Sequence, residues 1–124
     1  MNEGLRPALL RGGVIDITTT GRKTGEPRRI EIVFHNIGGR IYVSGMPRPE
    51  QRAWLTNLEG NPQFTFHLKG DVKADLPATA RIITDERERR EVLARVARIW
   101  KRNDVDLMVE QSPLIEVTFD DKAA

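Results

Sequence analysis

The sequence predicts a mainly β domain of the α+β class, with about six antiparallel strands and two helices. Apolar residues recur at every second position in several short segments, whereas only two segments repeat them at helical spacing. Strands that each have one apolar face need to cover one another, which favours a closed or partly closed barrel. No repeat or linker divides the chain, so we expect one domain at residues 14–119, a lead-in with a turn of helix at residues 1–13, and a tail at residues 120–124.

Two turns specify how neighbouring strands pair. The pair Gly38-Gly39 is a two-residue hairpin signal, and it places Phe34 opposite Val43. At the second turn we prefer a three-residue loop, because it aligns Leu68 with Ala74 rather than with the lysine before it. The predicted strands are residues 14–20, 29–36, 40–44, 63–69, 76–84 and 114–119.

Three strand residues carry further expectations. Pro77 cannot donate a backbone hydrogen bond to a neighbouring strand, so it predicts an edge position or a bulge. His35 and His67 alternate away from the apolar faces of their strands, and His35 has no second metal-ligand type at a useful spacing. We therefore expect both histidines to be solvated, and we expect no metal site.

Two helices are predicted outside the strands. The shorter helix covers residues 49–59, because Pro49 suits the first position of a helix. Its Trp54 is first of all a core residue and only secondarily a candidate wall for a ligand. The longer helix covers residues 86–102, with Asp85 as the capping residue and apolar side chains at helical spacing.

The composition excludes several classes of site and partner. The chain has no cysteine, so disulfides, thiolate zinc sites, iron–sulfur clusters and cysteine nucleophiles are excluded. Its net charge is only +2, from 20 basic and 18 acidic residues, and this balance argues against a nucleic-acid partner. No run resembles a signal peptide or a transmembrane segment, so a cytoplasmic protein is expected. The basic face of the longer helix leaves a peripheral membrane contact open.

Residues 18–29 carry the strongest functional signal, because four cations and two glycines lie between two predicted strands. The glycines allow positive φ and Pro27 restricts the chain, so the loop should be compact. Arg22 and Arg28 have planar guanidinium groups that suit phosphate or carboxylate, Lys23 is a compact charge, and the turn's N–H groups can bind anions. We interpret this segment as an anion cradle, the alternative being an ordinary basic hairpin. It matches neither the Walker A motif nor the dinucleotide fingerprint.

The segment Thr18-Thr19-Thr20-Gly21-Arg22-Lys23-Thr24-Gly25-Glu26-Pro27-Arg28 resembles the signature of the deazaflavin-dependent nitroreductase family. A hairpin strand at residues 39–44, a Gly/Pro loop and the pattern Trp54-Leu55-x-Asn57-Leu58-x-x-Asn61-Pro62 are also similar to that family. The resemblance covers about residues 14–119. It implies a split β-barrel fold and an oxidoreductase activity.

The resemblance further implies that the chain binds the 8-hydroxy-5-deazaflavin coenzyme F420, whose tail carries a phosphodiester and glutamate carboxylates. By this likeness Arg22, Lys23 and Arg28 would hold the anionic groups, with N–H groups offered by Thr24 and Gly25, and the ring system would lie at the end of the third strand. Hydride transfer is the chemistry of the coenzyme, so no catalytic side chain is required. The candidate cofactor-binding residues are Arg22, Lys23, Thr24, Gly25, Arg28, Ser44, Gly45 and Trp54.

The chain departs from the family pattern where the substrate would bind. The loop after the third strand reads Gly45-Met46-Pro47-Arg48-Pro49 instead of containing Gly-Gly, and Tyr42 is the only tyrosine. The acceptor therefore stays open, and we expect a small lipophilic molecule such as a quinone, an enone or a fatty acid. A non-catalytic deazaflavin carrier and a barrel that binds flavin mononucleotide (FMN) are the alternatives. Such sites often use a second subunit, so a homodimer is expected.

Overall fold

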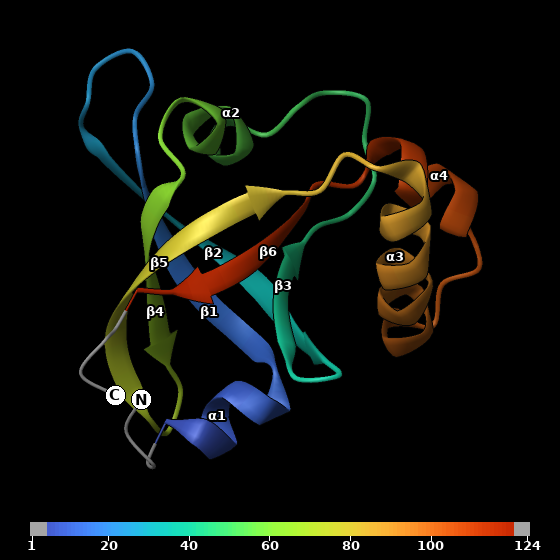
Figure 1. Ribbon diagram of the computed structural model, residues 1–124, viewed down its shortest axis with the longest axis horizontal. Coiled ribbons are helices and arrows are strands. Elements are labelled where there is room, and N and C mark those ends of the chain that lie inside the picture. Colours follow the sequence, from blue (N-terminus) through green and yellow to red (C-terminus); the bar gives the residue numbers. More distant parts are fainter. Residues whose placement is uncertain (1–4, 121–124) are drawn as a thin grey trace.

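A closed barrel of six antiparallel strands organises the computed structural model, which describes residues 5–120 (Figure 1). The strands are β1 (Gly13–Thr20), β2 (Pro27–Ile37), β3 (Arg40–Ser44), β4 (Gln63–Lys69), β5 (Lys73–Ile82) and β6 (Leu114–Phe119). They follow one another around the barrel in the order β1-β2-β3-β6-β5-β4, and β4 pairs with β1 to close it. The helices are α1 (Arg6–Arg11), α2 (Ala53–Gly60), α3 (Glu86–Trp100) and α4 (Val105–Gln111).

The strand registers agree with the two predicted turns. Phe34 lies opposite Val43 across the Gly38-Gly39 hairpin, and both glycines have positive φ, as a tight two-residue turn requires. Leu68 lies opposite Ala74, which confirms the three-residue loop. These registers direct the apolar faces into the barrel, where the inward-facing aromatic rings pack edge to face.

Pro77 does not lie in a bulge and β5 is not an edge strand, but Pro77 lies one residue beyond the last β5–β6 pair, so the predicted edge position holds only locally. β5 pairs with β4 on one side and with β6 on the other, and the pairing with β4 runs without interruption through Pro77 and Thr65. The carbonyl of Pro77 accepts from the backbone N–H of Asp120, one residue beyond the last β5–β6 pair, Ala78 and Phe119. The N–H and C=O of a strand residue point to the same side, so the N–H that proline lacks would face Asp120, where the β5–β6 ladder has already ended.

The helices agree with the sequence only in part. α3 begins as predicted, since the side chain of Asp85 accepts from the backbone N–H of Glu88 at 2.9 Å. α2 begins at Ala53 and not at Pro49, because the preceding residues form an extended loop. α4 was not predicted; its seven residues are too few for a helical pattern to emerge. Within residues 5–120, none of the helices has the length and apolar character needed to cross a bilayer.

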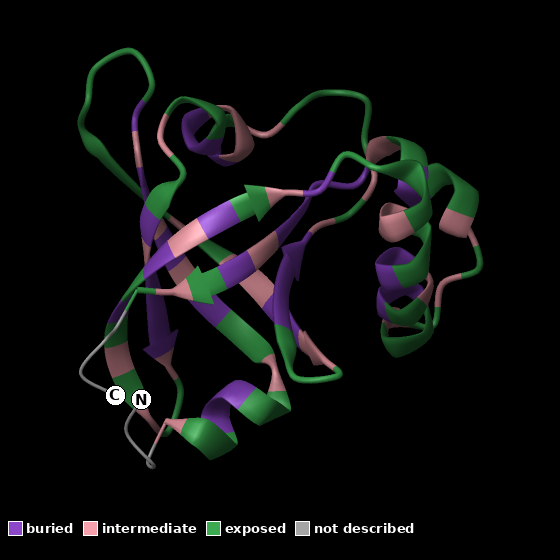
Figure 2. Ribbon diagram, in the orientation of Figure 1, coloured by how far each residue is buried: buried purple, intermediate pink, exposed green. Residues whose placement is uncertain are grey.

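A second apolar core lies outside the barrel, between its wall and the pair α3 and α4 (Figure 2). It buries the outward face of β2 and β3, including Tyr42 and His35, which are 5% and 4% exposed. His35 packs against Trp100, with ring centroids 5.4 Å apart. The expectation of a solvated His35 was therefore wrong, because strand alternation identifies a face but not the helix that covers it.

His67 is buried as well, at 7% exposure, so the second histidine prediction was also wrong. It lies on the outer side of β4 between two polar neighbours. Its Nε2 is 2.7 Å from Thr18 Oγ1 on β1, and its Nδ1 is 2.6 Å from Asp75 Oδ1 on β5. Closure of the barrel gives β4 a neighbour on each side, and their side chains enclose the imidazole.

Candidate functional site

The anion cradle forms the loop between β1 and β2, and its backbone is compact. The N–H of Gly21 donates to the carbonyl of Glu26 at 2.7 Å, and the N–H of Gly25 donates back to Gly21 at 2.8 Å. Gly25 has φ +75°, and a Cβ at Gly21 would lie 3.0 Å from the Glu26 carbonyl oxygen. Both glycines are therefore required by the turn. Because the N–H of Gly25 is used inside the loop, the N–H groups of Lys23 and Thr24 are those without a partner among residues 5–120.

Helix α2 holds this loop in place through Asn57, which is 8% exposed. The Oδ1 of Asn57 accepts from the backbone N–H of Arg22 at 3.0 Å, and its Nδ2 donates to Thr19 Oγ1 at 3.0 Å. The sequence analysis placed Asn57 in a motif but assigned it no role. An asparagine inside a short helix, where this residue is a poor helix former, was the available signal.

The cradle side chains and α2 enclose a cleft of about 480 Å³, here called the cradle cleft. Arg22 lies 3.7 Å from Glu59 and Arg28 lies 3.7 Å from Glu26, but both arginine side chains are more than half exposed. Such long, exposed ion pairs hold their partners weakly, so the guanidinium groups are available to a ligand. The cradle cleft is lined by Gly21, Arg22, Lys23, Thr24, Arg28, Arg29, Ile30, Ala53, Trp54, Thr56 and Asn57.

Most of the predicted site residues thus meet in the cradle cleft. Gly25 faces a different cleft of about 370 Å³ on the other side of the hairpin. Arg29 also lines the cradle cleft, and it donates to Asp16 at 2.9 Å. Trp54 is only 7% exposed, so it joins the barrel core and offers the cleft little more than an edge.

A second cleft of about 520 Å³ lies where β3 ends and is here called the β3-end cleft. It contains the two remaining predicted residues, Ser44 and Gly45. Ser44 is 1% exposed, and its hydroxyl has no hydrogen-bond partner within residues 5–120. A buried hydroxyl without a partner loses about 1–3 kcal/mol, so a group that pairs with it binds favourably. The β3-end cleft is lined by Ile32, Val33, Ser44, Gly45, Met46, Trp100 and Arg102.

The two clefts follow consecutive stretches of one strand. Residues 28–30 of β2 line the cradle cleft, and residues 32–33 line the β3-end cleft. A strand rises about 3.3 Å per residue, so the two stretches lie within about 10 Å of each other. An elongated ligand with an anionic tail and a flat apolar head therefore has a suitable surface along β2.

Arg52 positions the loop that forms one wall of the β3-end cleft. Its guanidinium donates to the carbonyl of Met46 and, at 3.2 Å, to the carbonyl of Gln111, the last residue of α4. Burial in this contact lowers the pKa of Arg52. A Cβ at Gly45 would lie 3.1 Å from Pro113 Cγ, so the absence of a side chain lets the loop pack against β6. Arg52 and Gly45 together fix where Met46 lies.

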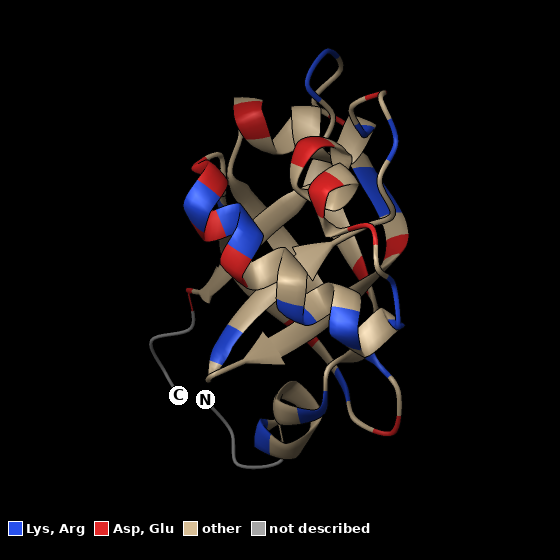
Figure 3. Cartoon of the chain, turned by 90° about the vertical axis from the view of Figure 1, so that its right-hand side faces the viewer, with Lys and Arg blue, Asp and Glu red and all other residues tan. Residues whose placement is uncertain are grey.

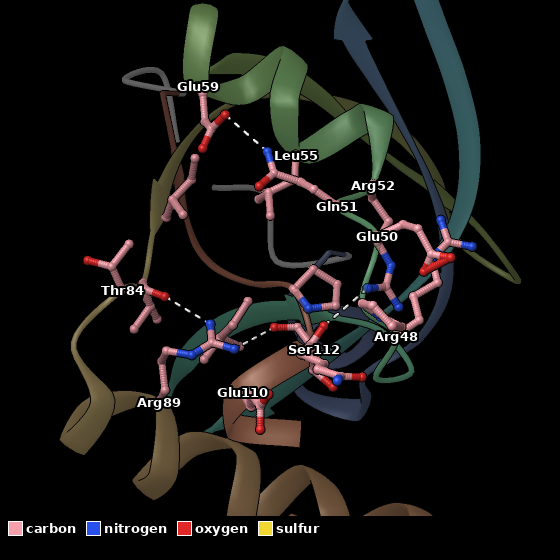
Figure 4. A pocket seen from close by; sticks show the side chains of 16 residues that line it. Arg48, Glu50, Gln51, Arg52, Leu55, Glu59, Thr84, Arg89, Glu110 and Ser112 are labelled. Atoms are coloured by element: carbon pink, nitrogen blue, oxygen red, sulfur yellow. Dashed lines mark hydrogen bonds between the residues drawn. The ribbon is translucent and has the colours of Figure 1, made fainter. Parts of the chain in front are cut away.

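Arg48 and Arg52 face a third cleft of about 510 Å³, shown in Figure 4, and not the cradle cleft. The same cleft contains Arg89, which donates to the carbonyls of Ile83 at 3.0 Å and Val109 at 2.9 Å, and also to Met108 and Ser112. Burial lowers the pKa of Arg89. Carbonyls already engage the half-buried guanidinium groups of Arg52 and Arg89, so these two arginines offer the cleft few free donors.

Comparison with known proteins bears on the family and the fold. The model of the F420H2-dependent quinone reductase family matches residues 3–118. A structure described as F420 reductase has TM-score 0.70 at 15% identity, over 98% of this chain and 97% of that one. A conserved hypothetical protein from Mycobacterium tuberculosis has TM-score 0.74 at 17% identity, over 98% and 82% of the two chains. A putative pyridoxamine 5'-phosphate oxidase from Listeria innocua has TM-score 0.69 at 13% identity, over 96% and 93%. The shared fold confirms the predicted split β-barrel.

Proposed function

Because the chain belongs to the F420H2-dependent quinone reductase family, we propose that it transfers a hydride between coenzyme F420 and a small lipophilic acceptor, foremost a quinone. Membership of this family makes the chain a deazaflavin-dependent oxidoreductase. The observation that supports the finer proposal is the succession of a cationic cleft and a largely apolar cleft along β2. An enone or a fatty acid is the second choice of acceptor.

The residues of the cradle cleft fit the tail of this coenzyme. Phosphodiester and carboxylate groups are anions, and Arg22 and Arg28 present guanidinium groups that can bind them with two parallel hydrogen bonds. Lys23 adds a compact charge, and the N–H groups of Lys23 and Thr24 lack partners among the described residues. We propose that these groups hold the tail, with Asn57 keeping the loop in position.

The residues of the β3-end cleft fit the ring system. Ile32 and Val33 present an apolar wall, and Ser44 offers a buried hydroxyl that lacks a partner within residues 5–120. A polar group on the edge of the ring would satisfy this hydroxyl without displacing an existing hydrogen bond. Gly45 adds no side chain at the same point. We propose that Ser44 and Gly45 contact the ring.

The protein's part in the reaction is then binding and orientation. When bound, the deazaflavin supplies the hydride-transfer chemistry itself. The chain holds the anionic tail through its cations and limits water at the reacting end with apolar side chains. Among the residues described, neither cleft is lined by an acidic residue or a histidine.

Titration with oxidised coenzyme F420, followed by its fluorescence, tests the proposal. We expect micromolar or tighter binding by the unchanged protein, and at least tenfold weaker binding, about 1.4 kcal/mol, for Arg22→Ala and for Lys23→Ala. Arg87→Ala removes an exposed cation at the start of α3, outside both clefts, and should change nothing. Unchanged binding in both cradle variants would contradict the assignment.

Two further arms separate the alternatives. FMN is titrated in competition, and tighter binding of FMN than of coenzyme F420 would favour the FMN-binding alternative. Reduced coenzyme is then offered with a panel of quinones, enones and nitroarenes. Tight coenzyme binding without turnover of any acceptor would favour a carrier over a reductase.

The homodimer, the cytoplasmic location and the peripheral membrane contact stay predictions. Light scattering during size-exclusion chromatography measures the mass of the particle, and a mass near twice 14.1 kDa is expected. Pelleting with anionic vesicles at low and high salt tests the membrane contact, because an electrostatic contact weakens as salt rises.

A further inference from the structure

One wall of the β3-end cleft comes from a part of the chain that the sequence analysis did not connect with it. Trp100 and Arg102 reach the cleft from the end of α3. Lys101 has φ +58°, the left-handed conformation, and it turns the chain so that the N–H of Arg102 donates to the carbonyl of Ala97 at 2.8 Å. A non-glycine residue in this conformation is uncommon, and here it directs Arg102 towards β3.

The guanidinium of Arg102 is held by Asp104 at two of its nitrogen atoms, and its third nitrogen has only a weak acceptor among residues 5–120. Its Nε donates to Asp104 Oδ1 at 2.8 Å, and its Nη2 pairs with Asp104 Oδ2. Among residues 5–120, the one hydrogen-bond partner of its Nη1 is Met46 Sδ, at 3.6 Å, and a thioether is a weak acceptor. The side chain is 25% exposed, and the carboxylate of Asp104 raises its pKa. Arg102 is therefore a fixed cation with donor capacity left at the cleft.

Apart from Asp104, the charged residues nearest in sequence on the helix side of Arg102 are basic. The first half of α3 carries acidic and basic residues together, whereas its charged residues after Glu91 are all basic (Figure 3). They are followed by Lys101 and Arg102, and Asp104 is the next acid in the chain. The β3-end cleft is bordered by this basic end of the helix, which favours an acceptor that becomes negatively charged.

We propose that Arg102 is the acceptor-binding residue, and that its Nη1 donates to the carbonyl oxygen of a quinone or an enone. This inference rests on the proposed function. In the reaction a hydride, two electrons with one proton, leaves the reduced deazaflavin, which is oxidised, and adds to the acceptor, which is reduced. Negative charge develops on the acceptor's oxygen and is later neutralised by a proton from water. A fixed cation at that oxygen stabilises the charge as it forms.

The same contact selects a class of acceptor. Quinones and enones place the new charge on one oxygen at the edge of a flat apolar ring or chain, and the cleft combines one cation with the apolar wall of Trp100, Ile32 and Val33. Asp104 acts through Arg102 as a positioning residue, since it holds the guanidinium at two atoms.

The test uses two probes that bind without turnover in the absence of reduced coenzyme. The first is 2-hydroxy-1,4-naphthoquinone, which is an anion at neutral pH and resembles the charged product, and the second is neutral 1,4-naphthoquinone. Calorimetric titration of the full chain should show tighter binding of the anion. Arg102→Gln should weaken the anion at least tenfold and the neutral quinone less than threefold. Arg87→Gln makes the same change of charge on an exposed residue of α3, outside the β3-end cleft, and should alter neither.

Arg102→Lys separates the effect of the charge from that of the guanidinium geometry. It keeps the cation but loses the planar group that Asp104 binds at two atoms. Its affinity for the anion should lie between those of Arg102→Gln and the unchanged protein. Equal binding of the two probes by the unchanged protein, or equal weakening of both by Arg102→Gln, would overturn the inference.

Failure of the inference and failure of the proposed function are distinguishable. Arg102→Gln should weaken coenzyme F420 binding far less than Arg22→Ala does, since the anionic tail would lie in the cradle cleft, away from Arg102. If the protein does not bind the coenzyme, the proposed function fails whatever the quinone titrations show. If it binds the coenzyme and reduces quinones equally well with Arg102→Gln, only the role of Arg102 fails.

Discussion

The side-chain oxygen of Asn57 accepts a hydrogen bond from the backbone N–H of Arg22 at 3.0 Å, which ties helix α2 to the anion cradle. The nitrogen of the same amide donates to the hydroxyl of Thr19, a residue only 2% exposed. A single buried amide thus connects β1, the loop that follows it and α2. The position of the loop's cations depends on a residue that itself carries no charge.

Replacement of Asn57 by alanine should therefore affect both stability and binding. The change leaves the buried hydroxyl of Thr19 and the N–H of Arg22 without their partner, which is expected to lower the free energy of unfolding by about 1–3 kcal/mol. Urea unfolding measures this loss, and a coenzyme F420 titration should show weaker binding. Asn103→Ala, at an exposed asparagine outside the cradle cleft, should change neither. A destabilised variant with unchanged affinity would mean that the loop keeps its shape without α2.

Substitution of Gly45 by alanine should destabilise the protein, because Pro113 already fills the space where a side chain would lie. In Gly45→Ala the new methyl would lie 3.1 Å from Pro113 Cγ, so the loop or β6 must shift, and we expect a loss of about 1–3 kcal/mol in unfolding free energy. Gly70→Ala is the matched control, since its Cβ would meet no atom within 4 Å; we expect its effect to be within about 0.5 kcal/mol. Equal unfolding free energies in the two variants would show that the loop yields easily.

Structural features that depend only on residues adjacent in the sequence were predicted correctly. The hairpin at Gly38-Gly39 fixes its own register through the backbone conformation of its glycines, so the pairing of Phe34 with Val43 followed from local pattern alone. The first residue of α2 did not follow, because Pro49 is compatible with a helix start but the loop is held extended by contacts of Arg52 with Met46 and Gln111. Those contacts join parts of the chain far apart in the sequence.

The candidate site likewise contains residues that the local sequence predicts and residues that only the tertiary structure brings in. The cations of the anion cradle are adjacent in the sequence, so their gathering in one cleft could be predicted from spacing. Asn57 and Arg102 reach the two clefts from helices whose positions depend on how the barrel closes. Strand alternation likewise gave the correct face for His35 but could not show that α3 and α4 cover it.

Burial of His35 gives the protein a specific dependence on pH. Loss of hydration lowers the pKa of His35 below its ordinary value of 6.5, so between the two values the unfolded chain binds a proton that the folded chain does not. Stability therefore rises with pH through this window, and it falls as the pH decreases below about 6.5. At pH values well above 6.5 the imidazole is neutral in both states, and its contribution no longer changes.

Urea unfolding at pH 7.5, 6.5 and 5.5 checks this dependence. His35→Phe should remove the part of the acid destabilisation that His35 causes, so its unfolding free energy should fall less between pH 7.5 and 5.5 than that of the unchanged protein. At pH 7.5 the variant should be about as stable, because Nε2 of His35 has no partner among the described residues and phenylalanine suits the apolar contact with Trp100. His35→Gln, which is polar but does not titrate, should show the same shallower pH profile. Parallel pH profiles for all three proteins would mean that His35 is protonated equally well in the folded and the unfolded chain.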